Sequence, residues 1–215
     1  FVQPAFDKAG QKLAFLYTDD KKEKDYTMSL WISENGGAAR ELANRTTTGL
    51  PEGWVISPNQ RLSFSDDAAR LFLGTAPAPL RKDTTILAAN RPNVQVWKWD
   101  EPVQYTVQHY NVKRDLKKSY AAIYWLNENK LVQVADVELP DAQLPVKGMG
   151  EWAIVSTSEP YSLSSMWEGR TRSDYYKVSL TNGERTLIAK ADYAGYRLSP
   201  AGKYVSTYNV TDSCW

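Results

Sequence analysis

The chain of 215 residues contains only one cysteine, Cys214, and one histidine, His109. A single cysteine excludes a disulfide within the chain and a structural zinc site, and Cys214 fits the role of a small apolar residue. The serine-rich stretch 162–165 lacks the G-x-S-x-G pattern. No second histidine is available as a base, and we expect His109 to be a polar surface residue. We therefore predict no catalytic residue, metal ligand or cofactor here.

Neither sign of charge predominates, and no long apolar run is present. The 26 Lys and Arg residues and the 25 Asp and Glu residues give a formal net charge of +1. This balance argues against a nucleic acid or another polyanion as a partner. No stretch approaches the roughly 20 apolar residues of a membrane helix, and none has the pattern of a signal peptide. We expect neither nucleic acid nor membrane as a partner.

Aromatic residues, by contrast, are abundant, and the length allows a sizeable core. Thirteen Tyr and eight Trp suit a β protein with large cross-strand side-chain pairs. A hairpin is easiest to recognise at residues 62–79. Leu62 and Phe64 alternate with serines, a polar turn follows at 66–69, and an apolar strand resumes at Leu71. We expect Gly74 and the following prolines to end that strand.

The same layout occurs more than once along the chain. An apolar residue precedes a Ser, Pro or Asp turn, and a small residue, a basic or polar residue and an apolar pair follow. The copies are residues 4–15, 62–73 and 196–205, with a weaker copy at 147–155. Their small turn residues are Gly10, Ala68, Gly202 and Gly150, respectively. Two of the intervals are close to the period of propeller blades, and the longer middle interval predicts an insertion.

A second hairpin follows most copies. It turns at Asn35-Gly36 within 29–43, at 127–129 within 121–135, and at Asn182-Gly183 within 175–189. Asn-Gly between alternating strands is a strong hairpin signal, because both residues accept positive φ. Two hairpins per unit give four strands, and four-stranded units repeated radially form a β-propeller. The alternative is an all-β sandwich with coincidental turns, which the recurrence in register disfavours.

We therefore predict an all-β chain, a β-propeller segment of about four blade-like, four-stranded antiparallel units. The expected units within one partial domain, 1–215, are 1–52, 53–140, 141–192 and an incomplete 193–215. Because the chain starts at Phe1 inside a repeat and ends just after another begins, we expect a piece of a longer protein. A short helical or irregular insertion is expected near 101–119, where apolar residues recur at helical spacing.

Other residues allow both a functional and a structural interpretation. Trp54 is expected to pack between blades, and residues 44–58 to link two units. Trp97 and Trp99 share one face of an expected strand, 93–99, either as a stacking platform for a sugar or base or as core between blades, and we expect core. The basic cluster late in the insertion is expected to be a solvated face: Lys113, Arg114, Lys117 and Lys118.

Three further segments carry weaker signals. The charged loop 19–25 alternates in sign, which disfavours a metal or phosphate site. Asp136, Glu138 and Asp141 suggest calcium, but their spacing does not match an EF-hand. Residues 44–46 and 209–211 match glycosylation sequons, a pattern too common to carry weight alone.

Several stretches together resemble the N-terminal propeller of bacterial serine peptidases of the prolyl oligopeptidase family, in particular large secreted members from Bacteroides-like bacteria. They are LSFSDDAARLFLGTAPAP, NVQVWKWDEPV, RDLKKSYAAIYWL, KLVQVAD, SDYYKVSLTNGERTLIA and YRLSPAGKYV. The turn motif is shared with TolB-like propellers, whereas residues 93–136 are the more specific part. The resemblance covers nearly the whole chain. It departs at Ala9-Gly10 and Ala201-Gly202, where Asp-Gly is usual.

The resemblance implies a propeller of seven or eight blades that caps an α/β-hydrolase domain and admits short peptides. The catalytic Ser, Asp and His of that family lie on the hydrolase domain and have no counterpart here. The Glu-Glu pair of the dipeptidyl-peptidase branch is also missing. We thus expect a non-catalytic, substrate-gating region of a periplasmic or secreted serine peptidase. The alternatives are a TolB-like ligand- or protein-binding propeller without an enzyme, and a partial propeller that self-associates through open sheet edges.

Overall fold

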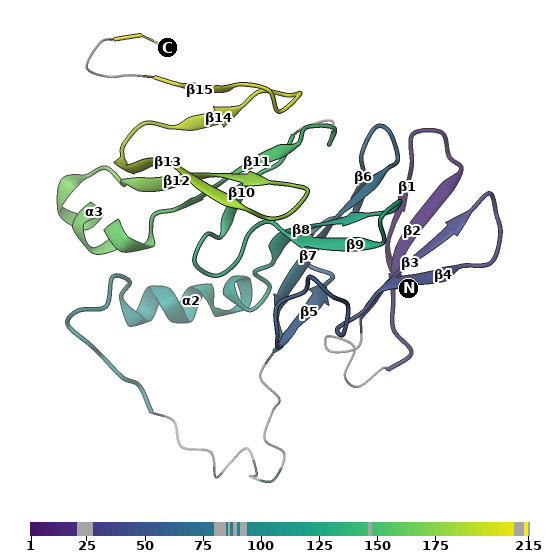
Figure 1. Cartoon of the computed structure of the whole chain (residues 1–215). Coiled ribbons are helices and arrows are strands. Elements are labelled where there is room, and N and C mark those ends of the chain that lie inside the picture. The colour runs from purple at the N-terminus through teal and green to yellow at the C-terminus, as the bar shows by residue number, and fades with distance from the viewer. Residues whose placement is uncertain are drawn as a thin grey trace.

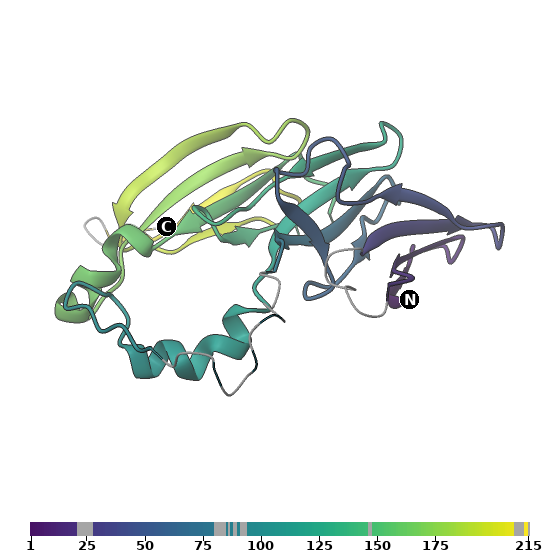
Figure 2. The ribbon, with the colours of Figure 1, turned by 90° about the horizontal axis from the view of Figure 1, so that it is seen from below.

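The computed structural model is built almost entirely from antiparallel sheets that follow one another in chain order (Figure 1). It describes residues 1–20, 28–79, 85, 87, 90, 94–145, 148–208 and 213–214. Successive sheets are stacked beside one another, and the two longer helices lie at the margin of this stack in both views (Figures 1 and 2).

The first sheet is a four-stranded meander in the order β1-β2-β3-β4. Its strands are β1 (Val2–Phe6), β2 (Lys12–Tyr17), β3 (Ser29–Glu34) and β4 (Arg40–Ala43). The hairpin between β3 and β4 turns at Asn35 (φ 51°) and Gly36 (φ 72°). Two consecutive positive φ values match the right-handed twist of the strands, and Asn and Gly tolerate them.

The second sheet has five strands, with the path β5-β7-β8-β9 and β6 also paired to β7. Its strands are β5 (Trp54–Ser57), β6 (Ser63–Phe64), β7 (Arg70–Pro77), β8 (Tyr120–Trp125) and β9 (Lys130–Gln133). Both β5 and β6 pair with β7 on the same side, because β7 is long enough for two short partners. Residues 78–119 are inserted between β7 and β8, and they contain α2 (Tyr105–Asp115).

The third sheet is again four-stranded, and the fourth has two described strands. The third consists of β10 (Asp141–Gln143), β11 (Trp152–Thr157), β12 (Ser173–Ser179) and β13 (Arg185–Asp192). A 3-10 turn, η2 (Glu159–Tyr161), and α3 (Ser162–Glu168) connect β11 to β12. The fourth sheet pairs β14 (Tyr196–Leu198) with β15 (Val205–Thr207).

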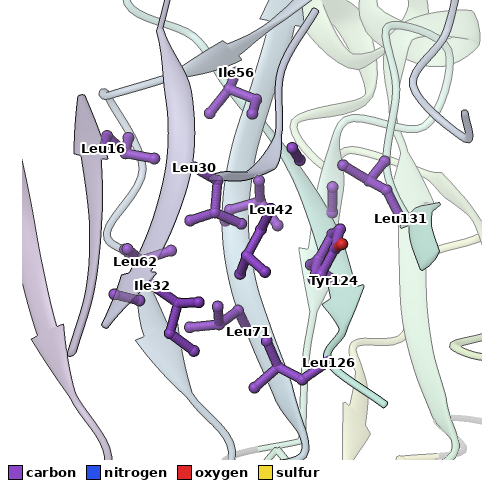
Figure 3. Close-up of a cluster of buried hydrophobic side chains, with 14 of the residues drawn as sticks. Leu16, Leu30, Ile32, Leu42, Ile56, Leu62, Leu71, Tyr124, Leu126 and Leu131 are labelled. Atoms are coloured by element: carbon purple, nitrogen blue, oxygen red, sulfur yellow. The ribbon is translucent and has the colours of Figure 1, made fainter. Parts of the chain in front are cut away.

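Two hydrophobic clusters hold the sheets face to face. The cluster between the first and second sheets is aliphatic apart from Tyr124 and the partly buried Phe64 (Figure 3). Its labelled members are Leu16, Leu30, Ile32, Leu42, Ile56, Leu62, Leu71, Tyr124, Leu126 and Leu131. The cluster between the second and third sheets includes Phe72, Ile123, Val155 and Val178. The alternation of strand side chains sends successive residues of β7 into different clusters, Leu71 into the first and Phe72 into the second.

The predicted fold class is confirmed: the chain is mostly β, with repeated four-stranded antiparallel sheets in a propeller-like series. The helical form of the predicted insertion is also confirmed by α2. Trp54 packs against the cluster between the second and third sheets, as predicted, with its ring 5.2 Å from that of Tyr120.

Three local predictions are wrong. The described part of the expected strand 93–99, from Val94 on, forms no strand. The expected link 44–58 contains β5. In the weaker repeat copy, the turn residue with the left-handed conformation is Gly148 (φ 66°) and not the predicted Gly150.

Gly74 does not end β7, contrary to expectation. It pairs with Ser57 on one side and Ala121 on the other, and the strand ends instead at Pro77, one of the prolines expected to end it. A Cβ at this position would lie 2.6 Å from the Cβ of Gln60. Gly74 therefore lets the Gln60 side chain approach the backbone of a continuous strand, and such close approach is another common reason for glycine in a sheet.

Candidate functional site

The groups that might form a hydrolytic triad are used in other ways. His109 lies on α2, and its exposed ring stacks on Tyr105 at 6.0 Å between centroids. The hydroxyls of Ser162, Ser164 and Ser165 donate to backbone carbonyls one helical turn earlier, at 2.7, 3.0 and 2.8 Å. The local backbone of η2 and α3 thus holds these three hydroxyls, whereas an activated serine nucleophile is paired with a base.

The acidic loop is a structural connection. The Asp136 carboxylate accepts hydrogen bonds from the backbone N–H of Glu138 and Leu139, both at 2.9 Å, and lies 2.7 Å from Arg185 Nη1. Burial opposes ionisation, but the hydrogen bonds from Leu139 and Arg185 outweigh it and hold the pKa of Asp136 below its usual value. The ion pair ties the end of the second sheet to β13.

The acidic residues do not gather into a metal site. Glu138 and Asp141 are exposed. Within the described part of the chain, no group of three His, Cys, Asp or Glu side chains is placed to hold a metal ion. Of the charged loop 19–25, only Asp19 and Asp20 are described. No described helix has the length and apolar character to span a bilayer.

The two sequons and Cys214 add no site. The Asn44 side-chain oxygen accepts hydrogen bonds from the backbone N–H and the hydroxyl of Thr46, at 2.8 and 2.7 Å. This is the local turn that Asn commonly forms. The second sequon, 209–211, lies outside the described residues, and Cys214 is exposed.

The insertion between β7 and β8 carries several exposed aromatic side chains. Trp97 is 64% exposed, Trp99 is 94% exposed and Tyr110 is 87% exposed. The prediction that Trp97 and Trp99 form core between blades is therefore wrong. The Trp97 ring lies 5.2 Å from that of Tyr105, which stacks in turn on His109. The alternative interpretation, in which Trp97 and Trp99 form a stacking platform that faces solvent, is consistent with this exposure.

The helix α2 stands away from the sheets, on one side of the stack (Figures 1 and 2). Every residue of α2 is at least partly exposed. The basic cluster predicted as a solvated face, residues 113–118, is exposed throughout, as expected. Lone helices of this length are marginal in water because nucleation is costly. An 11-residue helix that covers no core is thus a candidate contact surface for another molecule or domain.

The second helix at the margin, α3, is fixed by a polar cluster while its apolar residues stay exposed. The Tyr193 hydroxyl donates to Glu168 Oε2 at 2.7 Å, and Arg172 pairs with the same carboxylate. The hydrogen bond from Tyr193 lowers the pKa of Glu168 the most, and the bond from Arg172 lowers it further. Trp167, beside it, is 87% exposed. We take the insertion 94–119 and α3 together as the candidate contact surface.

The repeated turns form a second feature, with mixed charge. Lys12 Nζ donates to the carbonyl of Ala68 at 3.0 Å, and Lys8 pairs with Asp66 at 3.3 Å. An open recess of about 490 Å³ lies between these two turns. Charges of both signs line it, so it selects no one class of charged ligand.

Arg70 occupies the position of Lys12 in the next repeat and is buried. Its Nη1 donates to the carbonyl of Gly150 at 2.6 Å, and its guanidinium lies 4.3 Å from the centroid of the Trp125 ring. Burial lowers the pKa of Arg70, against the attraction of Asp67 and Glu151. The repeat is visible in the sequence but this contact is not, because the acceptor lies 80 residues away in the chain.

Comparison with known proteins gives no match to a family model and none to a curated protein sequence. Solved structures with similar chain paths include TolB from Acinetobacter baumannii, at 8% identity and a TM-score of 0.37, covering 94% of this chain and 36% of that one. The β-propeller domain of the Trilobed protease from Pyrococcus furiosus gives 10% identity and a TM-score of 0.44, over 91% of this chain and 45% of that one.

An acylaminoacyl peptidase from Pyrococcus horikoshii gives 11% identity and a TM-score of 0.41, over 92% of this chain and 26% of that one. The chain thus spans less than half the length of each of these three structures. At such identities these are similarities of chain path, and they assign no activity to this chain.

Proposed function

We propose that this chain is a non-catalytic propeller region that gates substrate access to a serine peptidase of the prolyl oligopeptidase family. The catalytic Ser, Asp and His would lie outside the chain, on an α/β-hydrolase domain of the same parent protein. The parent would be periplasmic or secreted and would cleave peptides. The sequence resemblance of residues 93–136 supports the choice of family.

One observation carries the gating role. The aromatic insertion leaves and re-enters the molecule between β7 and β8, two adjacent strands with almost wholly buried side chains. The exposed Trp97 and Trp99 lie on irregular backbone between these two buried strands. Exposed apolar patches commonly mark contacts with other chains or domains.

The test compares the purified chain 1–215 with the product of the complete gene. Each is treated with a fluorophosphonate probe, which labels activated serines, and with short peptide substrates and an unfolded protein. We expect the complete product to be labelled and to cleave the short peptides preferentially, and the chain 1–215 to do neither. Labelling of the chain alone would contradict the non-catalytic role.

A complete gene product that is not labelled by the probe would contradict the peptidase assignment and favour a TolB-like binding propeller without an enzyme. Cleavage of the unfolded protein at the same rate as the short peptides would support the peptidase assignment but contradict the gating role. To locate the gate, Trp97→Ala and Trp99→Ala are made in the complete product, with Asn127→Ala, in the exposed turn between β8 and β9, as the control. We expect the tryptophan variants to change the preference for short peptides and the control to leave it unchanged.

A further inference from the structure

The first and second sheets open with hairpins in the same register. In the first sheet Phe6 pairs with Leu13, and in the second Phe64 pairs with Leu71. Moving each pair by one residue gives Ala5 with Ala14 and Ser63 with Phe72. Residues of the two sheets can therefore be compared position by position, because equivalent residues point to the same side of their sheets.

In the second sheet, one set of these positions is covered by the preceding sheet. Leu71 and Leu73 are 0% and 1% exposed in the cluster that joins the two sheets, and Phe64 packs against that cluster. On the first sheet the equivalent positions are Leu13, Phe15 and Phe6. Leu13 and Phe15 are only half-buried and Phe6 is 65% exposed. The two residues beside Phe15 in β2, Ala14 and Leu16, face the second sheet and are buried.

The uncovered face of the first sheet is aromatic beyond these three positions. Phe1 packs edge-on against Phe15, with ring centroids 5.9 Å apart, and Tyr17 does the same against Trp31 at 5.9 Å. Tyr17 is 40% exposed, and Phe1 is 82% exposed. A contiguous apolar face of this kind on a sheet is typical of an interface.

Polar contacts between the sheets also follow the repeat. Lys12 of the first sheet donates to the carbonyl of Ala68, and Arg70 of the second donates to that of Gly150. In both cases the acceptor lies in a turn of the next sheet, but only Ala68 is itself left-handed (φ 51°), because Gly150 lies two residues beyond the left-handed Gly148 (φ 66°). On the first sheet the residue at the position of Ala68 is Gly10, which has the same left-handed turn conformation (φ 71°).

We propose that the face of the first sheet formed by Phe6, Leu13, Phe15, Tyr17 and Trp31 binds a further four-stranded antiparallel sheet. That sheet would present an aliphatic face, as the first sheet presents Ala14, Leu16 and Leu30 to the second. It would also carry Lys or Arg at the position of Lys12 and Arg70, donating to the Gly10 carbonyl. The contact continues the interface between the first and second sheets by one further repeat.

A second copy of this chain is a poorer occupant. The end of the molecule that would dock is the fourth sheet, which has two strands among the described residues. Its side chains at the positions of Lys12 and Ala14 are Tyr204 and Ser206. Neither is a cation or an aliphatic group, so this sheet lacks both features that the face requires.

The experiment measures the accessibility of position 6. In a Cys214→Ser background, Phe6→Cys is compared with Asn127→Cys, which lies in the exposed turn between β8 and β9. Both variants are made in the chain 1–215 and in the complete gene product, and they are labelled with a maleimide carrying a polymer chain. Phe15→Cys serves as a second probe of the same face, and circular dichroism confirms that each variant is folded.

In the chain 1–215 we expect positions 6 and 127 to react at similar rates. In the complete gene product, position 6 should react at least about tenfold more slowly than position 127, because labelling would require the sheets to open. Equal rates in the complete product would overturn the proposal. Protection in the chain 1–215 together with a dimer in sedimentation would also overturn it, in favour of a second copy. The outcome is independent of the peptidase assignment, since protection at position 6 does not require an active serine.

Discussion

The second sheet and the insertion that interrupts it are adjacent in the chain and opposite in character. Strands β7 and β8 are buried along almost their whole length, whereas every residue of α2 remains at least partly exposed. Tryptophan shows the same contrast. Trp125, at the end of β8, is half-buried beside Arg70 and donates to the Leu180 carbonyl at 2.8 Å, whereas Trp99 is 94% exposed.

This contrast separates stability from recognition. Burial of apolar area is the main favourable term in folding, so the sheets carry the stability of the molecule. The described part of the insertion, 94–119, buries little apolar area and instead presents an exposed surface. Three substitutions test this division, in order of decreasing effect on stability.

The largest loss of stability is expected from a cavity in the second sheet. Ile123 is 0% exposed and lies in the cluster between the second and third sheets. Ile123→Ala should lower the free energy of unfolding by about 3 kcal/mol, through lost transfer energy and a residual cavity. Urea denaturation measures the change. Val112→Ala on α2, where Val112 is 43% exposed, is the control, and a shift within about 0.5 kcal/mol is expected. A similar loss in both variants would contradict the division.

A smaller, pH-dependent effect is expected at the polar connection between the second and third sheets. Asp136→Asn keeps an oxygen acceptor for the Leu139 N–H but removes the charge that faces Arg185. The loss at pH 7 should be about 1–2 kcal/mol, because the pair is partly exposed and partly screened.

The direction of the pH effect follows from the lowered pKa of Asp136 in the fold, relative to the ordinary value of 3.8. The carboxylate stabilises the fold above that ordinary value, and its contribution is lost as pH falls through the folded pKa. The difference between wild type and Asp136→Asn should therefore shrink below about pH 4. Asp141→Asn, at an exposed acid, is the control. A difference that stays constant from pH 7 to pH 3 would show that the charge is not its source.

The smallest effect on stability is expected in the insertion. Trp99→Ala should change the free energy of unfolding by less than about 0.5 kcal/mol, because almost no area is buried at this side chain. The substitution should nevertheless remove a clear part of the tryptophan fluorescence that iodide quenches. Trp54→Phe, at a half-buried ring between sheets, should remove much less of that fraction. Marked destabilisation by Trp99→Ala would mean that the insertion packs on the body in solution.

Local signals in the sequence were sufficient for most of the hairpins. The Asn35-Gly36 turn needs two positive φ values, which few other residue pairs accept, and the strands on either side of it lie where alternation places them. The hairpins around 127–129 and 182–183 also lie where alternation places them, and each has one positive φ value in its turn, at Asn129 (49°) and Gly183 (76°). These elements form within about fifteen residues, so the sequence nearby contains nearly all the information that they need.

The insertion could be located from the sequence, but its exposure could not. Trp97 and Trp99 alternate as core residues of a strand would, yet the backbone from residue 94 on forms no ladder, so alternation there has no face to define. The roles of Asp136 and Arg70 were also not predictable, because their partners Arg185 and Gly150 are distant in the chain.

The sequence by itself determined most of the strands, their turns and their repetition, because propensity, alternation and turn chemistry act over short distances. The tertiary structure decided which faces are covered. Phe6 and Phe64 stand at the same position of the same motif, yet Phe64 packs in a core and Phe6 faces outward. The physical reason is that a sheet buries a face only against a neighbouring sheet, and the presence of that neighbour is not a property of the strand.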